Sequence, residues 1–243
     1  MGQLSKSQID KLGERLRGNA PQSADVRQLE EFRRSFVPAF SEVTLILRSH
    51  GIEFLERAAK STPSIIAKLK RGSMKLSRIQ DIAGCRILVK NRNDQDWTVE
   101  LLRAAFPTAI VKDRREKPNH GYRAVHVIPL VAGKYVEIQI RTRLQHLWAA
   151  VSEKAFDVID PEIKYGGGPQ ALKYFFAKSS DEVAEFEVME SEHSRMSLTQ
   201  IAAARDEWEL RSVEISRRRD SIVLALTNML SSLESRKGLK ELS

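Results

Sequence analysis

Apolar residues follow two spacings along this chain. A stripe with an apolar residue at every third or fourth position predicts a helix over residues 26–49, and it comprises Leu29, Phe32, Phe36, Phe40, Val43 and Leu47. Similar patterns predict further helices over 3–17, 63–71, 94–105, 143–157 and about 170–237. Runs of β-branched and apolar residues predict strands over 85–90, 109–112, 124–131 and 135–142.

These elements predict an α+β fold. Gly133 lies between the last two strands, which we therefore expect to form a hairpin. The strands together predict a mixed, largely antiparallel central sheet flanked by helices. A glycine run at 166–168 precedes a helical C-terminal extension. We expect N-terminal helices over 1–50, a core over 51–168 and the extension over 169–243.

Composition narrows the class of protein. The 243 residues are 42% apolar and 30% charged, which is typical of a soluble globular protein. No apolar segment is long enough for a transmembrane helix and no secretory signal is visible, so we expect a cytoplasmic protein with no membrane partner. Cys85, the single cysteine, excludes an internal disulfide and a multi-cysteine zinc site. The net charge of +8 fits a polyanionic partner, and it fits a merely basic surface equally well.

Two carboxylates are candidates for metal binding. In the strand 135–142, Val136, Ile138 and Ile140 alternate with polar residues, and Glu137 lies on the polar face. Asp81 precedes the strand 85–90, where Gly84 allows the backbone to approach a neighbour closely. Two such carboxylates could share Mg²⁺, which prefers oxygen ligands and bridges phosphates. An ordinary half-exposed strand and a turn aspartate would give the same pattern.

Basic residues cluster beside these carboxylates in sequence. Segment 56–75 holds six Lys or Arg residues against one acid, and a second basic cluster spans 112–117. Four side chains recur at helical spacing and should share one face, namely Lys60, Ser64, Lys68 and Arg71. Such a face suits the charge that spreads over oxygens during phosphoryl transfer. A solvated basic face is the alternative.

The segment 116–126 reads as a shaped polar loop. Pro118 and Gly121 set its shape, and Tyr122 offers a ring on which a base could stack. A β-turn with a packed tyrosine is the alternative. His126 and His146 lack the spacing of a zinc site, and no Walker A string occurs.

Four linked strings resemble the synthetase domain of the RelA/SpoT family, which includes stand-alone small alarmone synthetases and toxic relatives. The strings are KSTPSIIAKLKR (60–71), RIQDIAGCRI (78–87), KPNHGYRAVH (117–126) and VEIQIRT (136–142), and QHLWA (145–149) follows them. Together they cover roughly residues 50–165.

The resemblance implies a nucleotidyltransferase-like fold and a Mg²⁺-dependent transfer of the β,γ-pyrophosphate of ATP to a ribose 3′-hydroxyl. Asp81 would bind Mg²⁺, and Glu137 would bind Mg²⁺ or act as the general base. The implied ATP-binding residues are Lys60, Ser64, Lys68, Arg71, Arg86, Lys117 and Arg114 or Arg115. The implied acceptor-binding residues are Tyr122, His126, Gln139 and His146.

The resemblance leaves the acceptor open. GDP or GTP would give (p)ppGpp, whereas a toxic relative would modify the 3′ end of tRNA or adenine nucleotides and block growth, with an antitoxin protein as a further partner. Family members carry an adenine-stacking arginine two residues before the lysine that corresponds to Lys60; this chain has Ala58 there and Arg57 one residue earlier. Only about fifty residues precede the core, so we expect no hydrolase domain.

We expect the C-terminal helices to support a homo-oligomer or bind a partner; packing within the same chain is the alternative.

Overall fold

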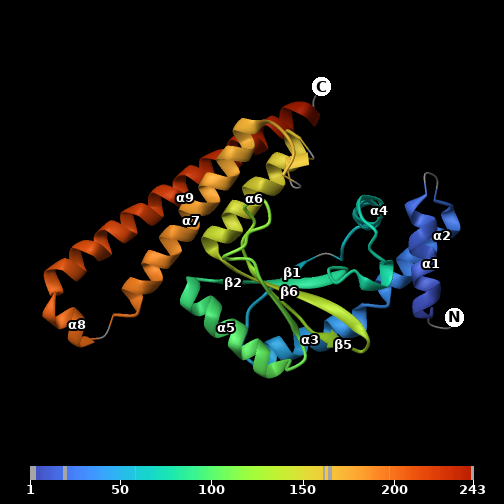
Figure 1. The fold of residues 1–243 in the computed structure, drawn as a ribbon, viewed down its shortest axis with the longest axis horizontal. Coiled ribbons are helices and arrows are strands. Elements are labelled where there is room, and N and C mark those ends of the chain that lie inside the picture. The colour runs from blue at the N-terminus through green and yellow to red at the C-terminus, as the bar shows by residue number, and fades with distance from the viewer. Residues whose placement is uncertain are drawn as a thin grey trace. The chain divides into compact units, whose positions relative to one another are not determined.

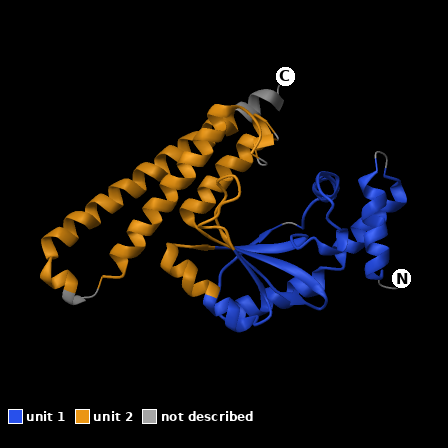
Figure 2. Ribbon diagram, viewed as in Figure 1, with its two compact units in different colours: residues 1–87, 100–112, 126–139 blue, residues 88–99, 113–125, 140–243 orange. Residues whose placement is uncertain are grey.

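The computed structural model describes residues 4–18, 21–57, 59–160, 162–163, 166–196 and 198–241. The chain folds into two compact units, coloured separately in Figure 2. The first unit contains residues 1–87, 100–112 and 126–139, and the second contains residues 88–99, 113–125 and 140–243. The predicted domain limits at residues 50 and 168 stay predictions.

The N-terminal part of the first unit is helical. It contains α1 (Lys6–Arg17), α2 (Ser23–Arg34) and α3 (Val37–Ser49). The single helix expected over 26–49 is therefore two helices, because the chain turns at Ser35 and restarts with Pro38 in the first turn of α3. Proline suits that position, where its missing N–H would have no helical partner.

Helix α4 (Thr62–Arg71) has the bounds that the sequence predicted to within one residue. Ser61 caps it by accepting a hydrogen bond from the Ser64 backbone N–H. Lys60 precedes this cap, so the expectation that Lys60 shares the helical face of Lys68 was wrong. A short 3₁₀ turn, η1 (Leu76–Arg78), follows. The apolar face of α4 packs into a core with α1 and α2 that includes Leu12, Leu16, Leu29, Ile65 and Leu69.

The sheet confirms the predicted fold class. Its strands are β1 (Leu55–Arg57), β2 (Ala83–Val89), β3 (Ile110–Asp113), β4 (Val125–Ile128), β5 (Leu130–Val131) and β6 (Lys134–Thr142). The order is β1-β2-β6-β4-β3, with β5 paired to β6. Both β1–β2 and β5–β6 are antiparallel. The strand expected over 124–131 is interrupted at Pro129, which lacks the N–H that a continuous ladder needs.

The turn between β5 and β6 explains the hairpin. Ala132 and Gly133 have φ values of 47° and 72°. Positive φ at both central residues is the geometry of a type I′ turn, whose twist matches that of the flanking strands. On β6, Val136, Ile138 and Ile140 are fully buried, as the alternation predicted.

The second unit is mainly helical. Alongside part of α5 (Arg92–Ala105), it contains α6 (Arg143–Val158), α7 (Gln170–Ser194), α8 (Leu198–Ala203) and α9 (Arg205–Glu241), which are labelled in Figure 1. Helices α6, α7 and α9 pack around one core that includes Trp148, Phe176, Phe186, Ile222 and Leu226. Thr142 caps α6 through a reciprocal pair of hydrogen bonds with Gln145. Among the described residues, no helix combines the length and apolar character needed to cross a membrane.

Candidate active site

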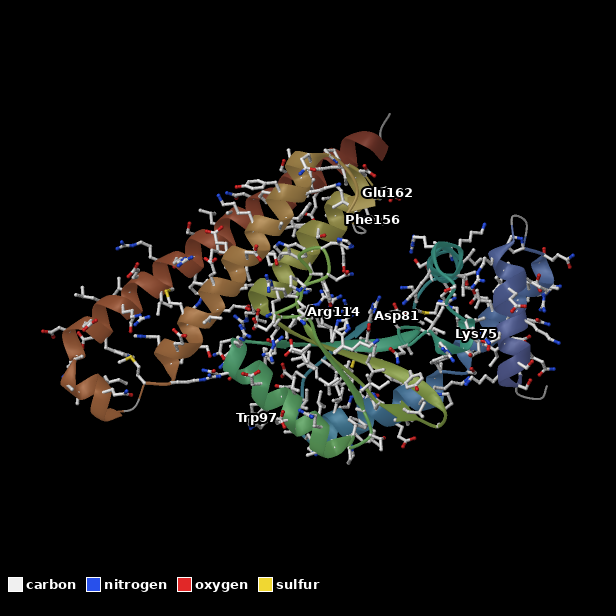
Figure 3. All side chains as sticks on the ribbon, viewed as in Figure 1. Lys75, Asp81, Trp97, Arg114, Phe156 and Glu162 are labelled. Carbon is white, nitrogen blue, oxygen red and sulfur yellow. The ribbon has the colours of Figure 1, made fainter. Side chains whose placement is uncertain are left out.

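Asp81, labelled in Figure 3, lies two residues before β2 and is held by two lysines. Lys60 Nζ donates to Asp81 Oδ2 at 2.9 Å, and Lys68 Nζ donates to Oδ1 at 2.8 Å. Burial raises the pKa of Asp81, but the charges of Lys68 and Lys60 outweigh that effect and hold the pKa well below its usual range. The carboxylate is therefore ionised at neutral pH, and it neutralises part of the basic segment.

Glu137 lies on the polar face of β6 and is only 8% exposed. Arg57 Nη1 and Gln139 Nε2 donate to its Oε2 at 3.1 and 2.7 Å, and His126 Nδ1 lies 3.1 Å from Oε1. Burial and the negative charge of Asp81 raise the pKa of Glu137, but His126 and Gln139 lower it to about 2. This face of β6 is therefore a buried polar site, which an ordinary half-exposed strand would not form.

Gly84 brings β2 close to the strand that carries Glu137. A Cβ atom at Gly84 would lie 2.3 Å from the Glu137 carbonyl oxygen, far inside van der Waals contact. The close backbone approach expected at this glycine is therefore present. Because Asp81 precedes Gly84 by three residues, the missing side chain lets both carboxylates belong to one site.

The segment that carries Lys60 and Lys68 is anchored at both ends by the N-terminal helices. Arg33 Nη2 donates to the Ala59 carbonyl at 3.2 Å, just before Lys60. Arg17 donates through Nε and Nη2 to the carbonyls of Leu69 and Met74, both at 3.0 Å, just after Lys68. The sequence contained no signal for these contacts, because they join residues 26 to 57 positions apart.

Three residues contact Glu137, which the sequence did not predict. His126 and Gln139, expected in the acceptor pocket, both contact Glu137. Arg57, noted only as an offset arginine, binds the same carboxylate. A stacking role for Arg57 on adenine would require it to leave Glu137, and Ala58 lies outside the described residues.

The candidate binding residues of the loop between β3 and β4 lie in the second unit. The Arg141 guanidinium lies 4.9 Å from the ring centroid of Tyr122, and Arg141 Nη2 donates to the tyrosine hydroxyl at 3.0 Å. Tyr122 also packs against the helical core. Arg115 binds Asp96 and Asp113, which raise the pKa of its guanidinium against the effect of burial. Within the described part of the chain, the buried Arg114 Nε has no hydrogen-bond partner.

The other predicted contacts stay predictions. Ser64 and Arg71 lie on exposed positions of α4, Arg86 on β2, Lys117 in the exposed loop and His146 on α6. Of Arg114 and Arg115, the guanidinium of Arg115 already binds two carboxylates, those of Asp96 and Asp113.

The part of this chain that carries the two carboxylates resembles known proteins. The sequence model for the region found in RelA and SpoT proteins matches residues 57–156. The GTP pyrophosphokinase YjbM of Bacillus subtilis is 31% identical over 156 residues, covering 58% of this chain and 71% of that protein. Uncharacterized proteins of Mycobacterium tuberculosis are 42% identical over 125 residues, covering 47% of this chain and 43% of theirs. The chain thus spans less than half the length of these mycobacterial relatives.

Solved structures agree with this grouping. Small alarmone synthetase 1 of Bacillus subtilis, bound to its product pppGpp, superposes with a TM-score of 0.54 and 25% identity, covering 68% of this chain and 96% of that one. A Streptococcus mutans protein gives a TM-score of 0.52 and 26% identity, covering 71% and 98%. Because the family model matches residues 57–156 and a 31%-identical relative is covered over 71% of its length, the chain belongs to the RelA/SpoT family.

Proposed function

We propose that this chain is a pyrophosphokinase that transfers the β,γ-pyrophosphate of ATP to the 3′-hydroxyl of GDP or GTP. The observation that carries the proposal is the pair of ionised carboxylates, Asp81 and Glu137, set among cationic side chains in one unit. The names of two similar proteins support the acceptor, since one is a GTP pyrophosphokinase and the other was solved with pppGpp.

The donor set of the site fits Mg²⁺. Asp81 and Glu137 offer hard anionic oxygens, and Mg²⁺ commonly uses one or two carboxylates together with substrate phosphates. When bound, the ion would neutralise charge that develops on the transferring phosphoryl oxygens. Lys60 and Lys68 could then turn from Asp81 to the ATP phosphates, because lysine binds phosphate as a mobile point charge.

Of the two roles open to Glu137, its environment favours the metal ligand. A general base is most effective when its pKa lies near the working pH. The pKa of Glu137 is about 2, so its carboxylate binds a proton weakly. Arg57 and Gln139 hold Oε2, and this fixed, ionised group is suited to bind a cation and orient the acceptor hydroxyl.

For the acceptor, we propose that Tyr122 stacks on the base and that His146 lines its pocket. The loop string KPNHGYRAVH carries this assignment through the family resemblance. Arg141 already lies against the Tyr122 ring, so a base would stack on a ring that a cation orients.

The test is to incubate the full chain with γ-labelled ATP and Mg²⁺, offering GDP, GTP, AMP, ADP, ATP and bulk tRNA in parallel. Thin-layer chromatography should show label on the guanine nucleotides. Glu137→Gln should abolish this transfer while ATP binding, measured separately, persists. If only tRNA or adenine nucleotides became labelled, the guanine acceptor in this proposal would be wrong and the labelled molecule would take its place. Transfer to no acceptor, or wild-type turnover by Glu137→Gln, would overturn the proposal.

A further inference from the structure

The loop between β3 and β4 is tied to helix α7, which lies outside the segment 57–156 that matches the family. We define this loop as residues 114–124 and call it the tyrosine loop, because it carries Tyr122. It is rich in charge and contains two consecutive residues with positive φ, His120 and Gly121. Such a polar connection needs contacts with a rigid element to keep one conformation.

Arg123 provides the main contact. Its Nε donates to Ser180 Oγ at 2.9 Å, its Nη2 donates to Asp181 Oδ1 at 2.5 Å, and its Nη1 donates to the Arg115 carbonyl. The guanidinium thus joins α7 to both ends of the tyrosine loop. Lysine could not reproduce this arrangement, because its single ammonium lacks the planar fork of donors.

Ser180 completes the contact from the helix side. Its side chain is buried, at 2% exposure, and its hydroxyl donates to the Gly121 carbonyl at 2.6 Å while accepting from Arg123. One hydroxyl therefore fixes the residues on either side of Tyr122. The backbone groups of Asn119 and Tyr122 also pair with each other, at 3.0 and 3.2 Å.

At Gly121 the backbone of the tyrosine loop packs directly against α6 and α7. A Cβ atom there would lie 2.6 Å from Trp148 Cζ2 and 3.0 Å from the Phe176 carbonyl, and its φ is 86°. Trp148 Nε1 in turn donates to Ser179 Oγ at 3.0 Å, so the ring that contacts Gly121 is itself fixed by α7. The loop backbone thus lies against α6 and α7 with no room for a side chain.

We propose that Ser180 and Asp181 of α7, acting through Arg123, are positioning residues that hold Tyr122 in place for the acceptor base. This inference rests on the proposed function of Tyr122. It gives α7 a part in acceptor binding that is separate from any role of the C-terminal helices in assembly. The buried Ser180 should matter more than Asp181, which is 62% exposed and whose ion pair is screened by solvent.

The experiment uses the full chain and three variants, Ser180→Ala, Asp181→Asn and Arg123→Lys. We expect Ser180→Ala and Arg123→Lys to raise the KM for GDP about 10-fold, as the loss of one well-placed hydrogen bond would, with the KM for ATP unchanged. Asp181→Asn should raise it less. Ser194→Ala is the control in the same helix, because among the described residues the Ser194 hydroxyl bonds within α7, to the Glu190 carbonyl.

A second measurement does not depend on turnover. Trypsin cleaves after Arg114 and Arg115 in the tyrosine loop, so a released loop should be cut faster in Ser180→Ala than in wild type or Ser194→Ala. Unchanged cleavage would overturn the attachment itself. Faster cleavage with an unchanged KM for GDP, or an equal loss of ATP and GDP affinity, would overturn the positioning role. A wild-type chain that uses no acceptor would instead refute the proposed function, and the positioning role with it.

Discussion

Replacing Gly84 by alanine is the sharpest test of how the two carboxylates share one site. The added Cβ would lie 2.3 Å from the Glu137 carbonyl oxygen, whereas ordinary van der Waals contact begins near 3.4 Å. The shortfall is 3.4 − 2.3 = 1.1 Å, and the obstacle is backbone, which cannot rotate away as a flexible side chain would. The strand at Glu137 must therefore move by about 1 Å relative to Gly84.

Two magnitudes follow from this displacement. Overpacking of this kind typically costs about 1–3 kcal/mol of stability. Misplacing a catalytic group by about 1 Å can cost about 10²-fold in rate. We therefore expect Gly84→Ala to stay folded but to lose about 10²-fold in kcat, with a smaller change in ATP binding, since Lys60 and Lys68 lie on a different segment.

The assay pairs urea unfolding with steady-state turnover of the labelled-ATP reaction. Gly72→Ala is the matched control, because a Cβ at Gly72 meets nothing nearer than the Met74 amide nitrogen at 3.9 Å and the residue has an ordinary extended φ of −138°. It should be neutral in both measurements. Wild-type turnover and stability in Gly84→Ala would refute the reasoning, since they would mean that the two strands are not held at this distance.

Four further outcomes are expected. Asp81→Asn should raise the magnesium requirement steeply, because an amide offers a dipole where the carboxylate offers a charge; a magnesium titration that overlays that of wild type would make Asp81 structural. Arg17→Ala should raise the KM for ATP about 10-fold, or about 1.4 kcal/mol, by freeing the carbonyls after Lys68, and an unchanged ATP titration would dismiss this anchor. Tyr122→Ala should weaken acceptor binding by about 1–3 kcal/mol and spare ATP, whereas equal losses in separate titrations would show that the ring only packs the core. Burial raises the pKa of Glu187 above its ordinary 4.5, despite hydrogen bonds from Thr142 and Gln145. The folded chain therefore holds this proton more tightly than the unfolded chain, and its stability falls as pH rises above 4.5; in Glu187→Gln this decline should be smaller, which urea unfolding at pH 5 and pH 8 would measure.

Local patterns predicted the elements well where each depends on nearby residues. The alternation of β6 and the turn at Gly133 were both visible in short windows of sequence. Pro129 and Pro38 altered predicted boundaries, because each removes a backbone N–H at a position where apolar spacing alone gives no warning.

The site was predictable in part. Family strings pointed to Asp81, Glu137 and the two lysines, and the structure pairs Asp81 with both lysines. The contacts of Arg57 with Glu137 and of Arg123 with Ser180 span 80 and 57 residues. Such pairs follow from the tertiary fold, and no spacing in the sequence encodes them. The sequence also cannot distinguish the neighbouring arginines 114 and 115. Arg115 binds two carboxylates, whereas among the described residues the buried Nε atom of Arg114 has no hydrogen-bond partner.

The two lysines on Asp81 have a consequence for the order of binding in the proposed reaction. Each oxygen of this carboxylate has its own ammonium counter-ion. A metal ion on the carboxylate would weaken its hold on the lysines, and phosphates on the lysines would weaken their hold on the carboxylate. Metal and triphosphate should therefore each promote the binding of the other. The cation and ATP would enter as a pair, and neither alone would displace the resident ion pairs efficiently.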